Sequence, residues 1–216
     1  MLTEHDFFRL SIGECEMNHQ IKLGTVGITR GTISRRLIGR ILLLAGVVCL
    51  STMGMSEAQE AANAAALTQL RGLAGDWEGP LEWSGARTGT GRVNATYYET
   101  GNGSAVVENL VMGGDVPSMT SVYHLDGADL RMTHYCAAQN QPRLKARQID
   151  LAKGVLDFDF VDATNLRSPD APHVYGLEMR LLRADHITLT FLFEGGGKQS
   201  REFIDLKRAG HKPSVQ

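Results

Sequence analysis

Cysteine is scarce in this sequence. The chain of 216 residues contains 3 cysteines, and Cys15 and Cys49 lie in an N-terminal segment that we expect to be removed from the mature protein. Cys136 is then the one cysteine of the expected mature chain, and a single cysteine cannot form an internal disulfide. This excludes a disulfide-stapled scaffold, even in an oxidising compartment.

An excess of positive charge is also missing. The chain has 22 Lys and Arg against 24 Asp and Glu, a net charge of −2. Because nucleic-acid binding needs a basic surface, we expect no nucleic-acid partner. Nucleophile-elbow, phosphate-loop and dinucleotide-binding motifs are absent as well. The glycine-rich stretches Gly101–Gly103 and Gly195–Gly197 separate predicted strands and precede no helix, which is typical of hairpin turns.

A short apolar run near the N-terminus predicts export. Three arginines precede Ile41–Leu50, a run too short for a comfortable membrane span. Ser56 and Ala58 are small residues at the −3 and −1 positions of a cut before Gln59. We therefore expect residues 1–58 to be a cleaved signal peptide and the mature protein to be periplasmic or extracellular, without a stable membrane span. A membrane anchor and a buried helix are the alternatives.

Further boundaries follow from composition. Met17 is an alternative start, which would make residues 1–16 an extension. Residues 59–72 are alanine-rich and predict a helix, ended by glycine. We expect a barrel domain over residues 73–210 and a flexible tail over 211–216. The apolar stripe of the predicted helix consists of Ala66, Leu67, Leu70 and Leu73.

From Asp76 onward the hydrophobic period changes to two, which indicates strands separated by turn-forming residues. About ten short strands after one helix predict an all-β fold, an antiparallel up-and-down barrel that leaves no open edge. Barrels of this size can hold one small ligand. The predicted strands lie near 76–84, 91–99, 104–112, 117–125, 129–137, 142–151, 154–161, 173–182, 186–194 and 199–208.

One tryptophan stands at the entry to the first predicted strand. Gly75 and Gly79 flank Trp77, so the chain can turn out of the helix there, and the indole can close the barrel end. Arg208 ends the last predicted strand and could stack on Trp77, joining first strand to last. We expect these four residues to form the barrel closure.

This arrangement resembles the calycin superfamily of lipocalin-like barrels. The segments LAGDWEG, MTHYCAAQNQPRLKA and FIDLKR are more closely similar to a family of secreted bacterial lipocalin-like proteins of unknown function. The resemblance implies the barrel fold and assigns no chemistry. A more distant similarity connects the chain to nitrobindin-type barrels, which bind haem through a histidine on the last strand. The last predicted strand here has no histidine and Leu81 replaces a glycine, so no cofactor is expected.

The densest polar cluster is the segment from His134 to Arg143. His134 and Cys136 share one face of a strand, which admits either a reactive Cys–His pair or a satisfied histidine beside a buried thiol. Asn140, Gln141 and Arg143 could bind the polar group of a ligand, or could serve the turn and the rim. Histidines with no close ligand spacing predict no metal site.

The number of predicted strands indicates at which end of the barrel this segment lies. The turn at Asn140 follows the fifth predicted strand and the Thr164–Pro172 loop follows the seventh, so both lie at the end opposite Trp77. We expect a pocket mouth there, with Arg143 reaching inward to an anionic group and His134 or Tyr135 on the wall below it.

Three functions remain open. The first is binding of a small, largely apolar or amphipathic ligand with a polar or anionic group, through His134, Tyr135, Asn140, Gln141 and Arg143. The second is a barrel enzyme that uses His134 with Tyr135 or Cys136 for acid–base chemistry. The third is a filled barrel that binds an envelope protein. The oligomeric state is left open.

Overall fold

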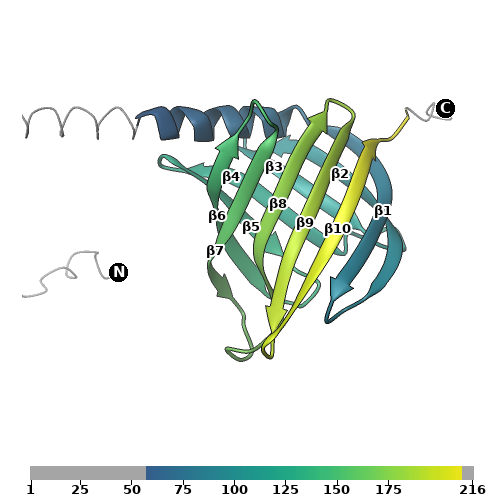
Figure 1. Ribbon diagram of the computed structural model, residues 1–216. Coiled ribbons are helices and arrows are strands. Elements are labelled where there is room, and N and C mark those ends of the chain that lie inside the picture. The colour runs from purple at the N-terminus through teal and green to yellow at the C-terminus, as the bar shows by residue number, and fades with distance from the viewer. Residues whose placement is uncertain (1–56, 211–216) are drawn as a thin grey trace, which may run out of the picture. The chain divides into compact units, whose positions relative to one another are not determined.

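A computed structural model describes residues 57–210, which form one helix followed by ten strands (Figure 1). The helix spans residues 57–71. Most of the expected signal peptide and the expected tail over 211–216 lie outside the described residues, and the expected cut before Gln59 falls in the first turn of the helix.

The ten strands form one closed antiparallel barrel in which each strand pairs with its neighbours in sequence and β1 pairs with β10. The predicted fold class is confirmed, and each predicted strand overlaps an observed one. The strands are β1 (Gly75–Gly85), β2 (Gly89–Thr100), β3 (Ala105–Val111), β4 (Met119–Asp126), β5 (Asp129–Tyr135), β6 (Gln141–Asp150), β7 (Val155–Thr164), β8 (His173–Arg183), β9 (His186–Gly195) and β10 (Lys198–Arg208).

Alternation of apolar and polar residues decides which side chains face the interior. On β9, Ile187, Leu189 and Phe191 are fully buried, whereas the alternating His186 and Thr188 remain partly exposed. Successive side chains of a strand point to opposite faces, so an alternating sequence fills the barrel with one set and presents the other set to solvent. The interior is therefore packed mainly by every second residue of each strand.

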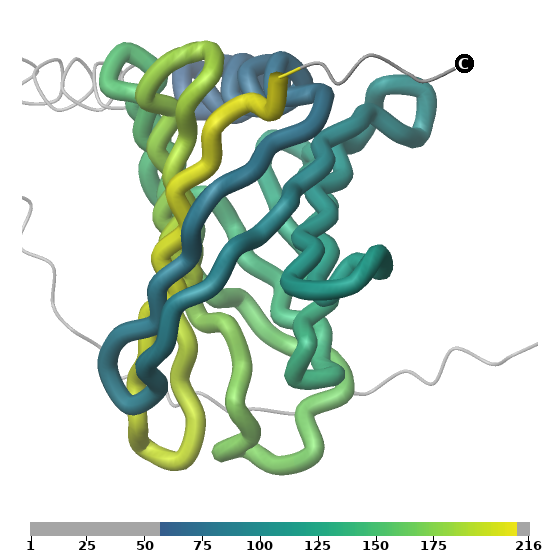
Figure 2. The backbone as a smooth tube through the Cα atoms, turned by 90° about the vertical axis from the view of Figure 1, so that its right-hand side faces the viewer, coloured from purple at the N-terminus to yellow at the C-terminus, as the bar shows by residue number. Residues whose placement is uncertain are grey.

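The helix closes one end of the barrel (Figures 1 and 2). Its stripe of Ala66, Leu67 and Leu70 is buried against the barrel core. Asn63 fixes the helix to the β4–β5 turn, because its side-chain Nδ2 donates to the carbonyl of Ala128 at 2.7 Å. Since burial of each such apolar side chain stabilises the folded state by about 1.5–3 kcal/mol, this contact holds the helix firmly on the barrel.

Trp77 and Arg208 join the first strand to the last at the same end. The two residues are partners in the β1–β10 register, and the Arg208 guanidinium carbon lies 4.4 Å from the centre of the buried Trp77 ring. The Trp77 indole N–H donates to the carbonyl of Leu73 at 2.8 Å, and Arg208 donates to the carbonyls of Ala74 and Gly72 at 2.8 and 3.1 Å. Helix end, first strand and last strand are thus locked together.

The flanking glycines are required by this geometry. Gly75 has φ +122°, a conformation that L side chains rarely adopt. A Cβ at Gly79 would lie 1.7 Å from the carbonyl oxygen of Asp205 on β10, so only glycine lets the two strands approach this closely.

The barrel ends differ in their connections. The helix and the β2–β3, β4–β5, β6–β7 and β8–β9 turns lie at the closed end, because strand direction alternates around the barrel. The other five connections, after β1, β3, β5, β7 and β9, gather at the opposite end, which we call the open end. These five include the longest described connections, residues 112–118 and 165–172.

Replacement of Trp77 by alanine tests the closure. Trp77→Ala removes a buried ring and its hydrogen bond, so we expect the free energy of unfolding to fall by about 3–5 kcal/mol in denaturant melts. Glu82→Ala, at an exposed position on the same strand, serves as the control and should change stability by no more than about 0.5 kcal/mol. A loss for Trp77→Ala as small as that of the control would show that the seam does not depend on the indole.

Candidate functional site

A pocket of about 510 Å³ occupies the open end of the barrel. Four of the five connections at that end contribute to its wall, through Ala86 and Arg87, Met112, Ala137 and Ala138, and Pro172, and Gly195 and Lys198 flank the fifth. Figure 2 shows the β1–β2, β7–β8 and β9–β10 connections at the end away from the helix. The pocket is thus bounded by loops around its mouth and by strands below.

The wall of the pocket is mostly apolar. Trp83, Met119 and Phe193 face it from β1, β4 and β9, and the rings of Trp83 and Phe193 lie 4.8 Å apart. Two cations lie at the mouth: Arg87, whose guanidinium is 3.8 Å from the centre of the Trp83 ring, and the exposed Lys198. Such a surface suits an apolar ligand body with few polar contacts.

Glu202 is the one fully buried carboxyl in this wall. It faces inward from β10 with Ile204 and Leu206, and neither of its side-chain oxygens has a hydrogen-bond partner among residues 57–210. Burial raises its pKa to about 7, an effect that the charge of Arg87 and the indole of Trp83 partly oppose. Its carboxyl group is therefore held between the neutral and ionised forms near neutral pH.

A second buried carboxyl, Glu108, is fully satisfied. Tyr97 and Tyr123 donate to its Oε2 at 2.6 and 3.1 Å, and Ser121 donates to its Oε1 at 3.2 Å. Burial raises the pKa of Glu108, and these three hydrogen bonds act in the opposite direction. The pKa values of both tyrosines are raised well above the usual value, first by burial, so they remain protonated donors.

His134 extends this network from β5. Its Nδ1 lies 3.0 Å from Ser121 Oγ, and because the Ser121 proton is given to Glu108, Nδ1 carries the proton of this hydrogen bond. Its Nε2 is then an acceptor, buried and without a partner in the described chain. Burial lowers the His134 pKa to about 3, so the ring is neutral at physiological pH, and it packs 5.0 Å from the Phe191 ring.

Cys136 and His134 do not form an activated pair. Both are buried, and Cys136, which directly follows β5, lines the pocket. However, burial raises the pKa of the Cys136 thiol, and its sulfur accepts from the Ala138 N–H at 3.4 Å. A neutral histidine bonded to Ser121 through one nitrogen, beside a buried thiol, is closer to the second of the two arrangements that the sequence left open than to a reactive pair.

Asn140 and Gln141 hold two loops of the open end together. Asn140 is buried and its Nδ2 donates to the carbonyl of Pro172 at 2.9 Å, while Gln141 accepts from Thr164 Oγ1 at 3.0 Å. Asn165 adds a bond from its Nδ2 to the carbonyl of Gln139 at 2.5 Å. The Asn140 turn and the Thr164–Pro172 loop therefore meet at the pocket mouth, and these two side chains position the loops.

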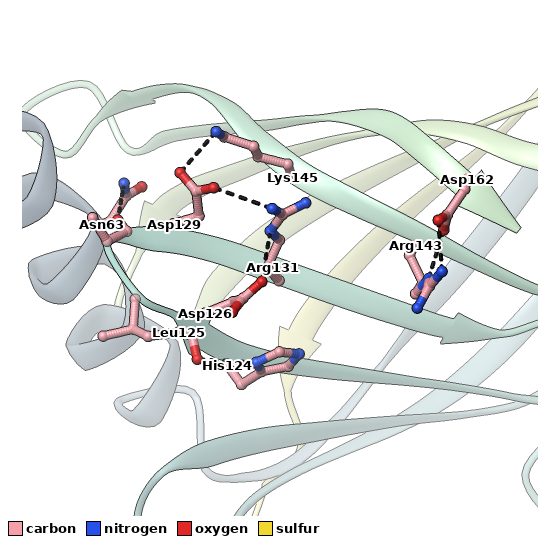
Figure 3. A network of polar contacts seen from close by, with 10 residues as sticks. Asn63, His124, Leu125, Asp126, Asp129, Arg131, Arg143, Lys145 and Asp162 are labelled. Carbon is pink, nitrogen blue, oxygen red and sulfur yellow. Dashed lines mark hydrogen bonds and ion pairs between the residues drawn. The ribbon is translucent and has the colours of Figure 1, made fainter. Parts of the chain in front are cut away.

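Tyr135 and Arg143 lie outside the barrel wall, contrary to the expectation that they face the pocket. Tyr135 is exposed on β5, next to the inward His134. Arg143 is exposed on β6 and forms a two-point ion pair with Asp162 at 2.5 and 2.6 Å (Figure 3). The pairing raises the pKa of Arg143 and lowers that of Asp162. Because Leu144 and Ala146 face inward, Arg143 must face outward, and an inward reach is wrong.

The same outer face carries a separate group of ion pairs. Asp129 contacts Lys145 at 2.7 Å and Arg131 at 3.2 Å, and Arg131 also pairs with Asp126 (Figure 3). These side chains are partly exposed, and exposed pairs contribute little to stability, about 0–1 kcal/mol each. They make the outer face of β4–β6 polar, and they do not reach the pocket.

Sequence reasoning missed Glu202 and Glu108 as interior residues. The alternation of apolar and polar residues could have predicted that both face inward. Glu108 shares its face with Val106 and Leu110, and Glu202 shares its face with Ile204. In each case the charged residue interrupts an otherwise apolar inward series. That interruption is the signal of a buried polar group.

Two further findings concern metals and membranes. Within residues 57–210, no three side chains of His, Cys, Asp or Glu lie together as a metal site would require. The helix of the described segment lacks the length and apolar character of a membrane span.

Glu202 should make stability depend on pH. Its folded-state pKa of about 7 lies above the usual 4.5, so folding is favoured while the carboxyl is protonated, and this stability is lost as pH rises from 4.5 to 7. Glu202→Gln removes the loss. The stability of the variant relative to wild type should therefore increase over that range, by at most about 3 kcal/mol. Urea melts at several pH values measure the difference, and a constant difference would contradict burial of an ionisable Glu202.

Comparisons with known proteins add two structural neighbours. The sequence matches no protein-family model, and no curated protein matches it. A protein of unknown function from the DUF3598 family of Nostoc punctiforme has 11% identity, covers 65% of this chain and 49% of its own, and gives a TM-score of 0.45. Rv2717c from M. tuberculosis has 16% identity, and the match covers 67% of this chain and 98% of the neighbour, with a TM-score of 0.44. This chain thus spans about half the length of the first neighbour. A calycin-like barrel fits the observed topology, and membership of the secreted bacterial family stays a prediction.

Proposed function

We propose that this protein binds one small, largely apolar ligand that carries a polar group, and that it does so in the pocket at the open end. The observation that carries the proposal is the pocket itself. Its volume of about 510 Å³ falls in the range of about 300–1,000 Å³ that is typical of small-molecule sites.

The packing of the interior favours a binding role over a filled barrel. The closed end is occupied by Trp77, Leu70 and neighbouring core side chains, each almost fully buried. The pocket remains only beyond the level of Phe191 and His134, where Met119, Cys136 and Glu202 face it. A ligand would therefore enter between the loops and rest on a rigid, already formed floor.

The chemistry of the wall favours binding over catalysis. An acid–base enzyme needs a titratable group within hydrogen-bond reach of the reacting atom and a partner that orients it. His134 has an orienting partner, Ser121, but its Nε2 is buried and the residue does not line the pocket. Ligand binding therefore accounts for more of the side chains around the pocket than acid–base catalysis does. Export, expected from the segment before Gln59, is a separate proposal.

The two tryptophans of the chain provide the test, because they stand at opposite ends of the barrel. Trp77 is sealed under the helix, and Trp83 lines the pocket. A brominated octanol quenches indole emission only at short range. In Trp77→Phe, which keeps Trp83, we expect saturating quenching of most of the emission. In Trp83→Phe, which keeps Trp77, emission should remain almost unchanged.

Calorimetry of the same alcohol with each variant is the control for this comparison, since it shows whether Trp83→Phe still binds. Equal quenching of both variants, or quenching of Trp77 alone, would place the ligand elsewhere. Absence of any binding to the wild-type protein would contradict the proposed function.

A further inference from the structure

The two buried glutamates of the barrel interior are in opposite situations. Glu108 accepts three hydrogen bonds, from Tyr97, Tyr123 and Ser121. Glu202 is equally inaccessible, yet neither of its oxygens accepts a hydrogen bond within the described chain. A buried polar group without a partner destabilises the folded state, so natural interiors rarely keep one without a role.

We propose that Glu202 is the anchor of the ligand and that the polar group of the ligand is a hydrogen-bond donor, an amine or a hydroxyl. This inference rests on the proposed function, and it goes further by naming the chemistry of the ligand and the residue that recognises it. The carboxyl lines the pocket from β10, in a mostly apolar wall where neither of its oxygens accepts a hydrogen bond from the described chain.

The neighbours of Glu202 include two donor groups, the Trp83 indole and the Arg87 guanidinium, but neither completes a hydrogen bond to its oxygens. Its register partners are Trp83 on β1 and Phe191 on β9, and neither makes a hydrogen bond to it. The guanidinium of Arg87 lies over the Trp83 ring and is exposed to solvent at the mouth. Glu202 lines the pocket although its oxygens are buried there, so a ligand that displaces the covering side chains would meet two acceptors without a partner.

A second unpaired acceptor lies close by in the fold. With the Ser121 proton given to Glu108, the matching tautomer of His134 has its proton on Nδ1 and leaves Nε2 as an acceptor. The His134 ring packs against Phe191, the cross-strand partner of Glu202. The interior thus presents unpaired acceptors around Phe191. Donors satisfy acceptors, which favours an amine or a hydroxyl over a carboxylate.

The anionic ligand expected from the sequence loses its basis in this arrangement. Its recognition depended on Arg143, which lies outside the barrel and is paired with Asp162. An anionic group placed at Glu202 would meet a carboxyl of like charge in an apolar site whenever Glu202 is ionised, which is unfavourable above its pKa of about 7.

Three probes with the same apolar chain test the inference: octylamine, octanol and octanoate. Titration calorimetry of the full chain should show octylamine binding at least about tenfold more tightly than octanoate, a difference of about 1.4 kcal/mol. In Glu202→Gln the preference for the amine should fall below about threefold. Octanol should still bind this variant, because the amide oxygen accepts its hydroxyl proton, and that binding shows that the pocket is intact.

Glu82→Gln is the matched control. It removes the same charge from β1 next to Trp83, but from an exposed position on the outer face, so the order of the three probes should not change. An equal loss of preference in the control would mean that overall charge, and not Glu202, sets the selectivity.

Two outcomes separate this inference from the proposed function. If the wild-type protein binds all three probes equally, or octanoate most tightly, the inference is wrong while the pocket remains a binding site. If the wild-type protein binds none of the three, both the inference and the proposed function fail.

Discussion

The structure depends on the seam between its first and last strands. Trp77 and Arg208 pair across β1 and β10, and the arginine also holds the carbonyls of Ala74 and Gly72 at the end of the helix. One contact therefore closes the barrel laterally and fixes the helix over one end. Because a tryptophan and an apolar helix face fill this end of the interior, the mostly apolar pocket that we propose as the binding site lies at the other end.

The two buried carboxyl groups of the barrel interior differ in whether they accept hydrogen bonds. Around Glu108, three hydroxyl groups donate to the carboxyl oxygens, and Ser121 also bonds His134, whose Nε2 lacks a partner in the described chain. Around Glu202, an apolar wall leaves a carboxyl without a partner, and burial raises its pKa to about 7. A protein interior that could satisfy one carboxyl so completely, and that leaves the other facing a cavity, has the polarity of a site built for an external donor.

Much of this fold was predictable because a strand repeats every two residues. Alternation and turn residues indicated the ten strands, and the strand count alone placed the Asn140 turn and the Thr164–Pro172 loop at one end. The candidate site was less predictable. A shift of one residue reverses the face, so His134 faces inward while Tyr135 faces outward. Arg143 was selected for its chemistry, although Leu144 and Ala146 already indicated its outward direction. The contact between Glu202 and the pocket could not be predicted, because it depends on which loops surround the barrel mouth.

The central claim is that the open end, and no other part of the barrel, receives a small apolar molecule. Methionine methyl groups labelled with carbon-13 test it most directly by NMR, since Met112 and Met119 line the pocket whereas Met179 is buried in the core outside it. On titration with octanol, the account predicts saturable shifts of the Met112 and Met119 methyl signals and an unchanged Met179 signal. Unchanged pocket methyls, or an equal shift of Met179, would contradict it.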